Sequence, residues 1–154
     1  MNSSNSKSNK KNNCDGLVSY KESLPVSSDT LLNTLSIWNI NFKLFQHIPL
    51  NTVEESKIYY SSLGQTDDSI AHIKNLYLRD HKKNNYLLVA QQDKKIDLKQ
   101  LSILMKAGRL SFGSSDRLLE FLGVRPGAVT PLAMINGIKK GVNLFLDIDL
   151  RSYL

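Results

Sequence analysis

The sequence predicts a single α+β domain with a mixed, largely antiparallel sheet packed by helices. Three observations lead to this fold class. At 154 residues and 41% hydrophobic content, the chain is long enough to bury one sizeable core. Segments with helical periodicity and segments with strand-like alternation follow one another without strict β–α–β alternation. A pattern typical of a β-hairpin lies in the middle of the chain.

Four segments have the features of helices. In the first, Ser28 or Asp29 is a candidate N-cap, and apolar residues follow at helical spacing. These apolar residues are Leu31, Leu35 and Trp38. In the second, Thr52 and Glu55 form a capping box. The third is expected to start at Asp97 and the fourth at a serine cap with an acidic first turn. The second, third and fourth helices are expected to end at Gly64, Gly108 and Gly123 respectively.

The strands are expected between these helices. Residues 42–47 alternate as an extended segment, and the hairpin joins strands 73–79 and 85–90 through a polar turn. "RLSFG" predicts a short strand and "GVNLFLDID" a strong last one. Between them, "VRPGAVTP" must be irregular because two prolines and a glycine fix a tight loop.

One strand has an unusual side-chain pattern. Alternation puts Lys74, Leu76 and Leu78 on one face of the first hairpin strand and the residues between them on the other. A lysine on an apolar face costs desolvation unless it opens onto a cavity or a bound anion. The other interpretation is a lysine that extends along the strand's edge to water. Spacing alone leaves both open.

The charge of the chain is unevenly distributed. Of the net charge of +6, residues 1–13 carry +3 from three lysines, Lys7, Lys10 and Lys11. Residues 1–20 are therefore expected to be a disordered basic tail, and residues 21–154 the folded domain. A basic surface favours a polyanion such as RNA, whereas the simpler interpretation of the tail is a solubilising leader.

Several function classes find no support in the sequence. No apolar run is long enough for a membrane span or a secretory signal, and Cys14, the single cysteine, cannot form an internal disulfide. A cytoplasmic location is expected on these grounds. There is no glycine-rich phosphate loop or nucleophile elbow, and the three histidines lack metal-ligand spacing. Neither a metal nor another cofactor is expected.

The motifs together resemble the prolyl-tRNA editing domain family of the YbaK/ProX type. Six segments follow the family in order: "HIPLNTVEES", "HIKNLYLRD", "NYLLVA", "KIDLKQLS", "GRLSFGSSDRLLEFLGV" and "RPGAVTPLAMIN". The resemblance as a whole covers about residues 28–150. The resemblance is strongest to deacylases of Ala-tRNA(Pro), which occur alone or fused to prolyl-tRNA synthetase. It implies a metal-independent hydrolase that acts on the aminoacylated 3′ end of tRNA.

The resemblance also implies site residues. Lys74 matches the family's pocket lysine and is the expected catalytic residue, and Asn75 matches the neighbouring pocket asparagine. A backbone-presenting loop is expected at Gly123, Gly127 and Ala128. His47 and Thr52 match the pocket mouth. Tyr77 and Gly113 depart from the family's usual phenylalanine and alanine.

The family pattern leaves the exact role of the chain open. Family members continue past the last strand with a His-Pro pair and a final helix, which these residues lack, so the chain is expected to be a fragment or a trimmed domain. The leading hypothesis is a trans-editing deacylase of Ala-tRNA(Pro), with prolyl-tRNA synthetase as a candidate partner. The alternatives are a deacylase of another misacylated tRNA such as Cys-tRNA(Pro), and a non-catalytic tRNA-binding or docking module of the synthetase.

Overall fold

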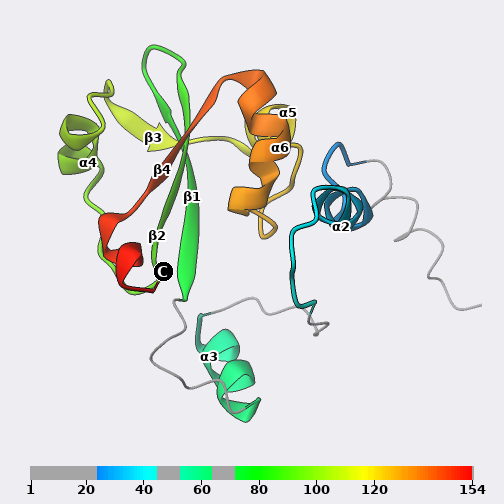
Figure 1. Cartoon of the computed structure of the whole chain (residues 1–154). Helices are drawn as coiled ribbons and strands as arrows, with labels where there is room; N and C mark the ends of the chain where they lie inside the picture. The colour runs from blue at the N-terminus through cyan, green and yellow to red at the C-terminus, as the bar shows by residue number, and fades with distance from the viewer. Residues whose placement is uncertain (1–23, 45–52, 64–71, 154) are drawn as a thin grey trace, which may run out of the picture.

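A four-stranded mixed sheet organises the protein. The computed structural model describes residues 24–44, 53–63 and 72–153 (Figure 1). The strands are β1 (Ile73–Asp80), β2 (Asn85–Gln91), β3 (Leu110–Phe112) and β4 (Val142–Leu146). Their order is β3-β1-β2-β4, with β1 antiparallel to both β2 and β3, and β4 parallel to β2. The expected α+β class with a largely antiparallel sheet is confirmed.

The central hairpin matches its sequence prediction almost residue for residue. Ile73 pairs with Gln91 at one end of the β1–β2 ladder and Arg79 with Asn85 at the other. Each strand extends one residue beyond the expected range. Residues 85–90 of β2 are all buried, as an apolar strand between two neighbours and two helical layers should be.

Helices cover both faces of the sheet, as Figure 1 shows. On one face, Tyr77 and Leu87 pack with α5 (Ser115–Leu122) and α6 (Met134–Gly137). On the other face, Leu78 and its neighbours pack against α4 and the turns at its two ends. Residues from α4 and its flanks that join this cluster are Ile96, Leu98, Leu101, Met105 and Ala107. The two clusters form separate cores on opposite sides of the sheet.

Capping residues fix most helix ends. Asp97 caps α4 (Leu98–Leu104) and Ser114 caps α5, while Gly123 ends α5 with φ 71°, as expected. The first described helix, α2 (Ser28–Ile37), is capped by Ser27 and not by either candidate, because the Ser27 side chain accepts from the Thr30 N–H. In that helix Leu35 is buried, whereas Trp38, just after it, is 57% exposed.

The predicted end of α4 at Gly108 was wrong. The helix stops at Leu104, and Lys106 takes the left-handed conformation with φ 51°. The Lys106 N–H donates to the Ile103 carbonyl and the Ala107 N–H to the Ser102 carbonyl, which is the Schellman pattern. The stop signal therefore falls two residues before the glycine.

The remaining segments connect these layers. Residues 41–44 form no strand, contrary to the extended ladder that alternation suggested, and the rest of that segment lies outside the described residues. Helix α3 (Val53–Ser62) is present, but Thr52 and Gly64 at its expected ends lie outside the described part.

Loop 124–130 is irregular as predicted. Three 3-10 helices complete the described part of the chain: η1 (Pro131–Ala133), η2 (Ile138–Lys140) and η3 (Ile148–Tyr153). In the described residues no helix is long and apolar enough to cross a membrane.

The buried Asp80 carboxylate fastens the hairpin turn. It is 3% exposed and accepts hydrogen bonds from the Asn84 side chain at 2.9 Å, the Asn84 N–H at 2.9 Å, the Tyr86 hydroxyl at 3.0 Å and the Gly108 N–H at 3.3 Å. Burial alone would raise its pKa, but these donors favour the charged form and lower the pKa to about 2 from 3.8.

We predict that stability depends on the charge of Asp80. Because its folded-state pKa lies below the unfolded value, its contribution is full above pH 3.8 and is lost as the pH falls towards 2. That contribution is about 2 kcal/mol, so Asp80→Asn should lower the unfolding free energy at neutral pH and flatten its pH dependence below pH 4. Urea denaturation across this range, with the exposed Asp116→Asn as control, measures both effects. Parallel pH curves for wild type and Asp80→Asn would contradict the assignment.

Candidate active site

Lys74 and Asn75 begin β1 on opposite faces of the sheet. Lys74 lies on the α4 face, level with Ala90 of β2 and on the same side as Leu76 and Leu78. Its ammonium donates to the main-chain carbonyl of Lys94, in the turn between β2 and α4. The lysine is half-buried and, within the described part of the chain, has no carboxylate partner. A neutral carbonyl thus holds a cation that could bind an anion instead.

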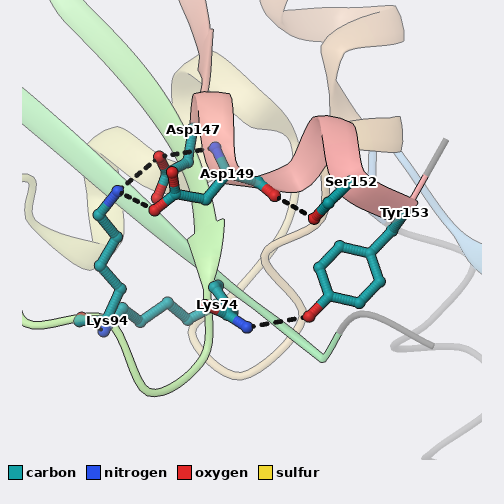
Figure 2. A network of polar contacts seen from close by, with 7 residues as sticks. Lys74, Lys94, Asp147, Asp149, Ser152 and Tyr153 are labelled. Atoms are coloured by element: carbon teal, nitrogen blue, oxygen red, sulfur yellow. Dashed lines mark hydrogen bonds and ion pairs between the residues drawn. The ribbon is translucent and has the colours of Figure 1, made fainter. Parts of the chain in front are cut away.

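A polar network surrounds this carbonyl (Figure 2). The Lys94 ammonium donates to Asp147 Oδ1 and to Asp149 Oδ2, each at 2.7 Å. The bonds to Asp147 and then to Asp149 raise the pKa of Lys94. Beside them the Gln91 amide donates to the Tyr153 hydroxyl at 3.1 Å. The network therefore fastens η3 to the end of β2 and fixes the turn that holds Lys74.

Sequence reasoning missed two members of this network. The pair Asp147 and Asp149 reads as an ordinary strand exit, yet the Asp147 side chain is only 8% exposed. Its Oδ2 atom is buried and has no hydrogen-bond partner among the described residues. The available signal was a D-x-D sequence directly after an apolar strand, together with a lysine at the end of the neighbouring strand.

Asn75 connects β1 to the Pro/Gly loop on the other face. Its Nδ2 donates to the Val129 carbonyl at 2.9 Å. Its Oδ1 is buried and accepts no hydrogen bond from the residues that the structure describes. A buried acceptor without a partner costs about 1–3 kcal/mol. The Asn75 oxygen is therefore suited to a donor supplied by a ligand.

The three predicted loop positions have different environments. Gly123 is buried in the α5 cap: its N–H donates to the Leu119 carbonyl at 3.0 Å and its carbonyl accepts from Val26 at 3.2 Å. A Cβ there would lie 3.0 Å from Pro25 and Val26 atoms. Gly127 and Ala128 are exposed, and open space surrounds the missing Cβ of Gly127, which has φ 87°. His47 and Thr52 lie outside the described residues.

A cavity of about 340 Å³ opens on the Lys74 face, between β2, β4 and α4. Its floor is apolar and includes Ala90, the cross-strand neighbour of Lys74, and Phe145. Lys94 and Asp147 also line it. The structure thus brings Asn75 together with the loop around Gly127, and places Lys74 beside the cavity and the carboxylate pair. The described residues contain no group of three potential metal ligands.

Comparison with solved structures supports the fold. The crystal structure of hypothetical protein APE2540 matches with a TM-score of 0.60 at 21% sequence identity, and the match covers 79% of this chain and 75% of that one. At this identity the likeness shows the architecture alone. It agrees with the mixed sheet and two helical layers described above.

Sequence comparisons identify the family. The prolyl-tRNA editing protein ProX of Acetoanaerobium sticklandii is 41% identical over 113 residues, covering 72% of this chain and 65% of that protein. Prolyl-tRNA synthetase associated domain-containing protein 1 of Danio rerio is 35% identical over 112 residues, covering 73% of this chain and 58% of its own length. The chain thus spans about three-fifths of these relatives. The family model for the aminoacyl-tRNA editing domain matches residues 51–154, more than half of the chain, and the chain therefore belongs to the aminoacyl-tRNA editing domain family.

Proposed function

We propose that this protein is a trans-editing deacylase that hydrolyses the ester of mischarged Ala-tRNA(Pro). Its family membership and its similarity to a protein named as a prolyl-tRNA editing protein support this proposal. The observation that carries the chemistry is at the start of β1. There a lysine is followed in sequence by a buried amide oxygen that has no partner among the described residues. The substrate of such an enzyme offers both a phosphate for the lysine and a ribose hydroxyl or ammonium for the amide.

Lys74 is proposed to bind the 3′-terminal phosphate or ribose. A phosphate adds the attraction of opposite charges to the hydrogen bond, which a neutral carbonyl does not offer, so a phosphate competes well with the Lys94 carbonyl. The long lysine stem lets the ammonium leave this carbonyl and pass the end of the strand. Asn75 Oδ1 accepts a hydrogen bond from the substrate on the loop side.

Hydrolysis is proposed to rely on positioning. Backbone N–H groups of the exposed turn at Gly127 stabilise the negative charge that develops on the ester carbonyl. A water attacks the ester, and the terminal ribose of the substrate assists its deprotonation. Proposed in this way, the reaction needs neither a metal nor a side-chain triad.

Size is the proposed basis of selectivity. A synthetase built for proline cannot strongly reject the smaller alanine by binding alone, so a second site that admits only the smaller group removes the error. A deacylation assay with Ala-, Cys- and Pro-tRNA(Pro) tests this directly. Hydrolysis of the alanyl ester should be fastest, and preference for the cysteinyl ester would favour the alternative substrate.

A docking role is the second candidate, and one observation favours it. Apolar side chains at the end of α2 and just after it lie exposed, and this segment precedes the family match. They are Ile37, Trp38, Ile40, Phe42 and Leu44. Exposed apolar side chains that follow one another this closely in the sequence suit a protein-binding surface. Under this proposal the partner is prolyl-tRNA synthetase, and a deacylation assay that detects no hydrolysis would favour it.

We predict that Lys74→Ala lowers kcat/KM for deacylation by about 10- to 150-fold, which is the loss of one charged hydrogen bond worth about 1.5–3 kcal/mol. The melting temperature should change little because the ammonium bonds only a carbonyl at the sheet's end. Lys99→Ala, which removes an exposed lysine from α4, should leave deacylation unaltered. Unchanged turnover in Lys74→Ala would remove the lysine from the mechanism.

We predict that substitutions at Gly123 and Gly127 have different effects, because Gly123 has a structural role and Gly127 a substrate-binding role. Both have positive φ, but only Gly123 has neighbours where a Cβ would lie. Gly123→Ala should therefore lower the unfolding free energy by about 1–3 kcal/mol more than Gly127→Ala. At a temperature where both variants are folded, Gly127→Ala should deacylate more slowly than Gly123→Ala. Urea denaturation and single-turnover kinetics on both variants provide the comparison, and the reverse order of rates would show that the turn at Gly127 does not contact substrate.

A further inference from the structure

Four cations gather at the end of the sheet farthest from Lys74. Lys82 and Lys83 lie in the β1–β2 turn, and Lys106 and Arg109 lie between α4 and β3; we name these four residues the basic tip. Figure 1 shows the hairpin turn and the α4–β3 connection at the same end of the sheet. All four side chains are exposed, and none forms an ion pair with another described residue.

Two hydrogen bonds hold the halves of the basic tip together. The Asp80 carboxylate accepts from the Gly108 N–H at 3.3 Å, and His81 Nδ1 accepts from the Arg109 N–H at 3.1 Å. These contacts join segments 28 residues apart in the sequence. The imidazole also occupies the space that a Cβ at position 108 would need. The four cations are therefore displayed on a fixed surface.

Two of these lysines occupy backbone positions that favour glycine. Lys83 has φ 71° and Lys106 has φ 51°. The Lys83 N–H donates to the Asp80 carbonyl at 3.1 Å, so Lys83 fills the left-handed position of a hairpin turn with a bulge. Lys106 fills the equivalent position after α4. Apart from Asn39, no other non-glycine residue in the described ranges has positive φ.

A long cation at such a position costs free energy that glycine would not. An outlier of this kind is a reason to look for a function of the side chain itself. The charge is also not neutralised locally. Asp80 is the only acid in residues 79–84 and 105–110, and it is buried under its own hydrogen bonds.

We propose that the basic tip binds backbone phosphates of the tRNA body, away from the site that holds the aminoacylated 3′ end. The choice of RNA as the polyanion rests on the proposed function. The tip lies about 23 Å from Lys74, since seven strand steps of about 3.3 Å each lead from Lys74 to His81. That separation places the contact beyond the terminal nucleotide. Such a contact strengthens binding without touching the ester.

The test uses the double variant Lys83→Gly/Lys106→Gly. Glycine suits both backbone positions, so the variant should melt at or above the wild-type temperature. Binding of uncharged tRNA is measured over a series of salt concentrations. Loss of two phosphate contacts should reduce the slope of log affinity against log salt by about 1.4–1.8. At about 0.1 M salt this corresponds to about 25- to 60-fold weaker binding.

A matched control removes two exposed lysines elsewhere. Lys43→Gln/Lys99→Gln changes the net charge equally, but neither residue belongs to the basic tip. It should leave the salt slope close to wild type, and Lys83→Arg/Lys106→Arg should keep full affinity. Equal losses in the glycine variant and the glutamine control would overturn the proposal, because net charge alone would then explain binding.

Two further measurements separate this inference from neighbouring ones. The deacylation rate at saturating substrate should be the same in wild type and in the glycine variant. A reduced rate with unchanged tRNA affinity would overturn the proposal by placing the tip at the ester. Binding to vesicles of phosphatidylcholine and phosphatidylserine that depends on the tip, without an effect on tRNA, would overturn it in favour of a membrane. If wild type fails to deacylate but still binds tRNA through the tip, the proposed function fails while the tip's role stands.

Discussion

The side-chain alternation along β1 is the constraint on which the rest of the structure depends. This strand lies between β2 and β3 and contacts both helical layers, so each of its central apolar residues is committed to one core or the other. Tyr77 belongs to the α5 side, and Leu76 and Leu78 belong to the α4 side. A shift of one residue would exchange these sets and bury Lys74 and Asn75 on the wrong faces. The Asp80 hydrogen bonds in the turn prevent that shift, because they fix where the ladder with β2 begins.

The same alternation decides where a reaction centre can lie. Lys74 and Asn75 point to opposite faces of the sheet and bond to different segments there. A single substrate can meet both around the end of β1 or around its β3 side, because β3 pairs only with residues 78–80 of β1. The two faces offer different groups at this end: a charged network with Asp147 on one side, and the amide and the loop around Gly127 on the other. An aminoacyl-tRNA end is itself two-sided, since a charged backbone and a small acyl group project from one ribose.

Local rules predicted much of this structure, and contacts between distant segments account for what they missed. The hairpin, the Asp97 cap and the Gly123 stop depend on neighbouring residues, so the sequence shows them directly. The partner of Lys74 is a main-chain carbonyl twenty residues away, and any residue type could supply it. The pairing of Lys94 with Asp147 crosses 53 residues and needs the parallel β2–β4 ladder to bring the ends together. For Asn75 and the loop, the resemblance named the residues, but their hydrogen bond appears only in three dimensions.

The end of α4 shows why a local rule can name the right signal at the wrong residue. Glycine usually ends a helix because it tolerates the left-handed conformation. Gly108 is not in that conformation in this chain; it is a glycine because the His81 ring fills the space of a Cβ. The left-handed position belongs to Lys106, where a glycine would be easier for the backbone. Gly108, whose missing side chain makes room for His81, and Lys106, which occupies a position that favours glycine, are two residues apart. Both lie on the surface to which the hairpin turn also contributes. Violations of local preference that cluster on one surface are typical of a site that serves a ligand.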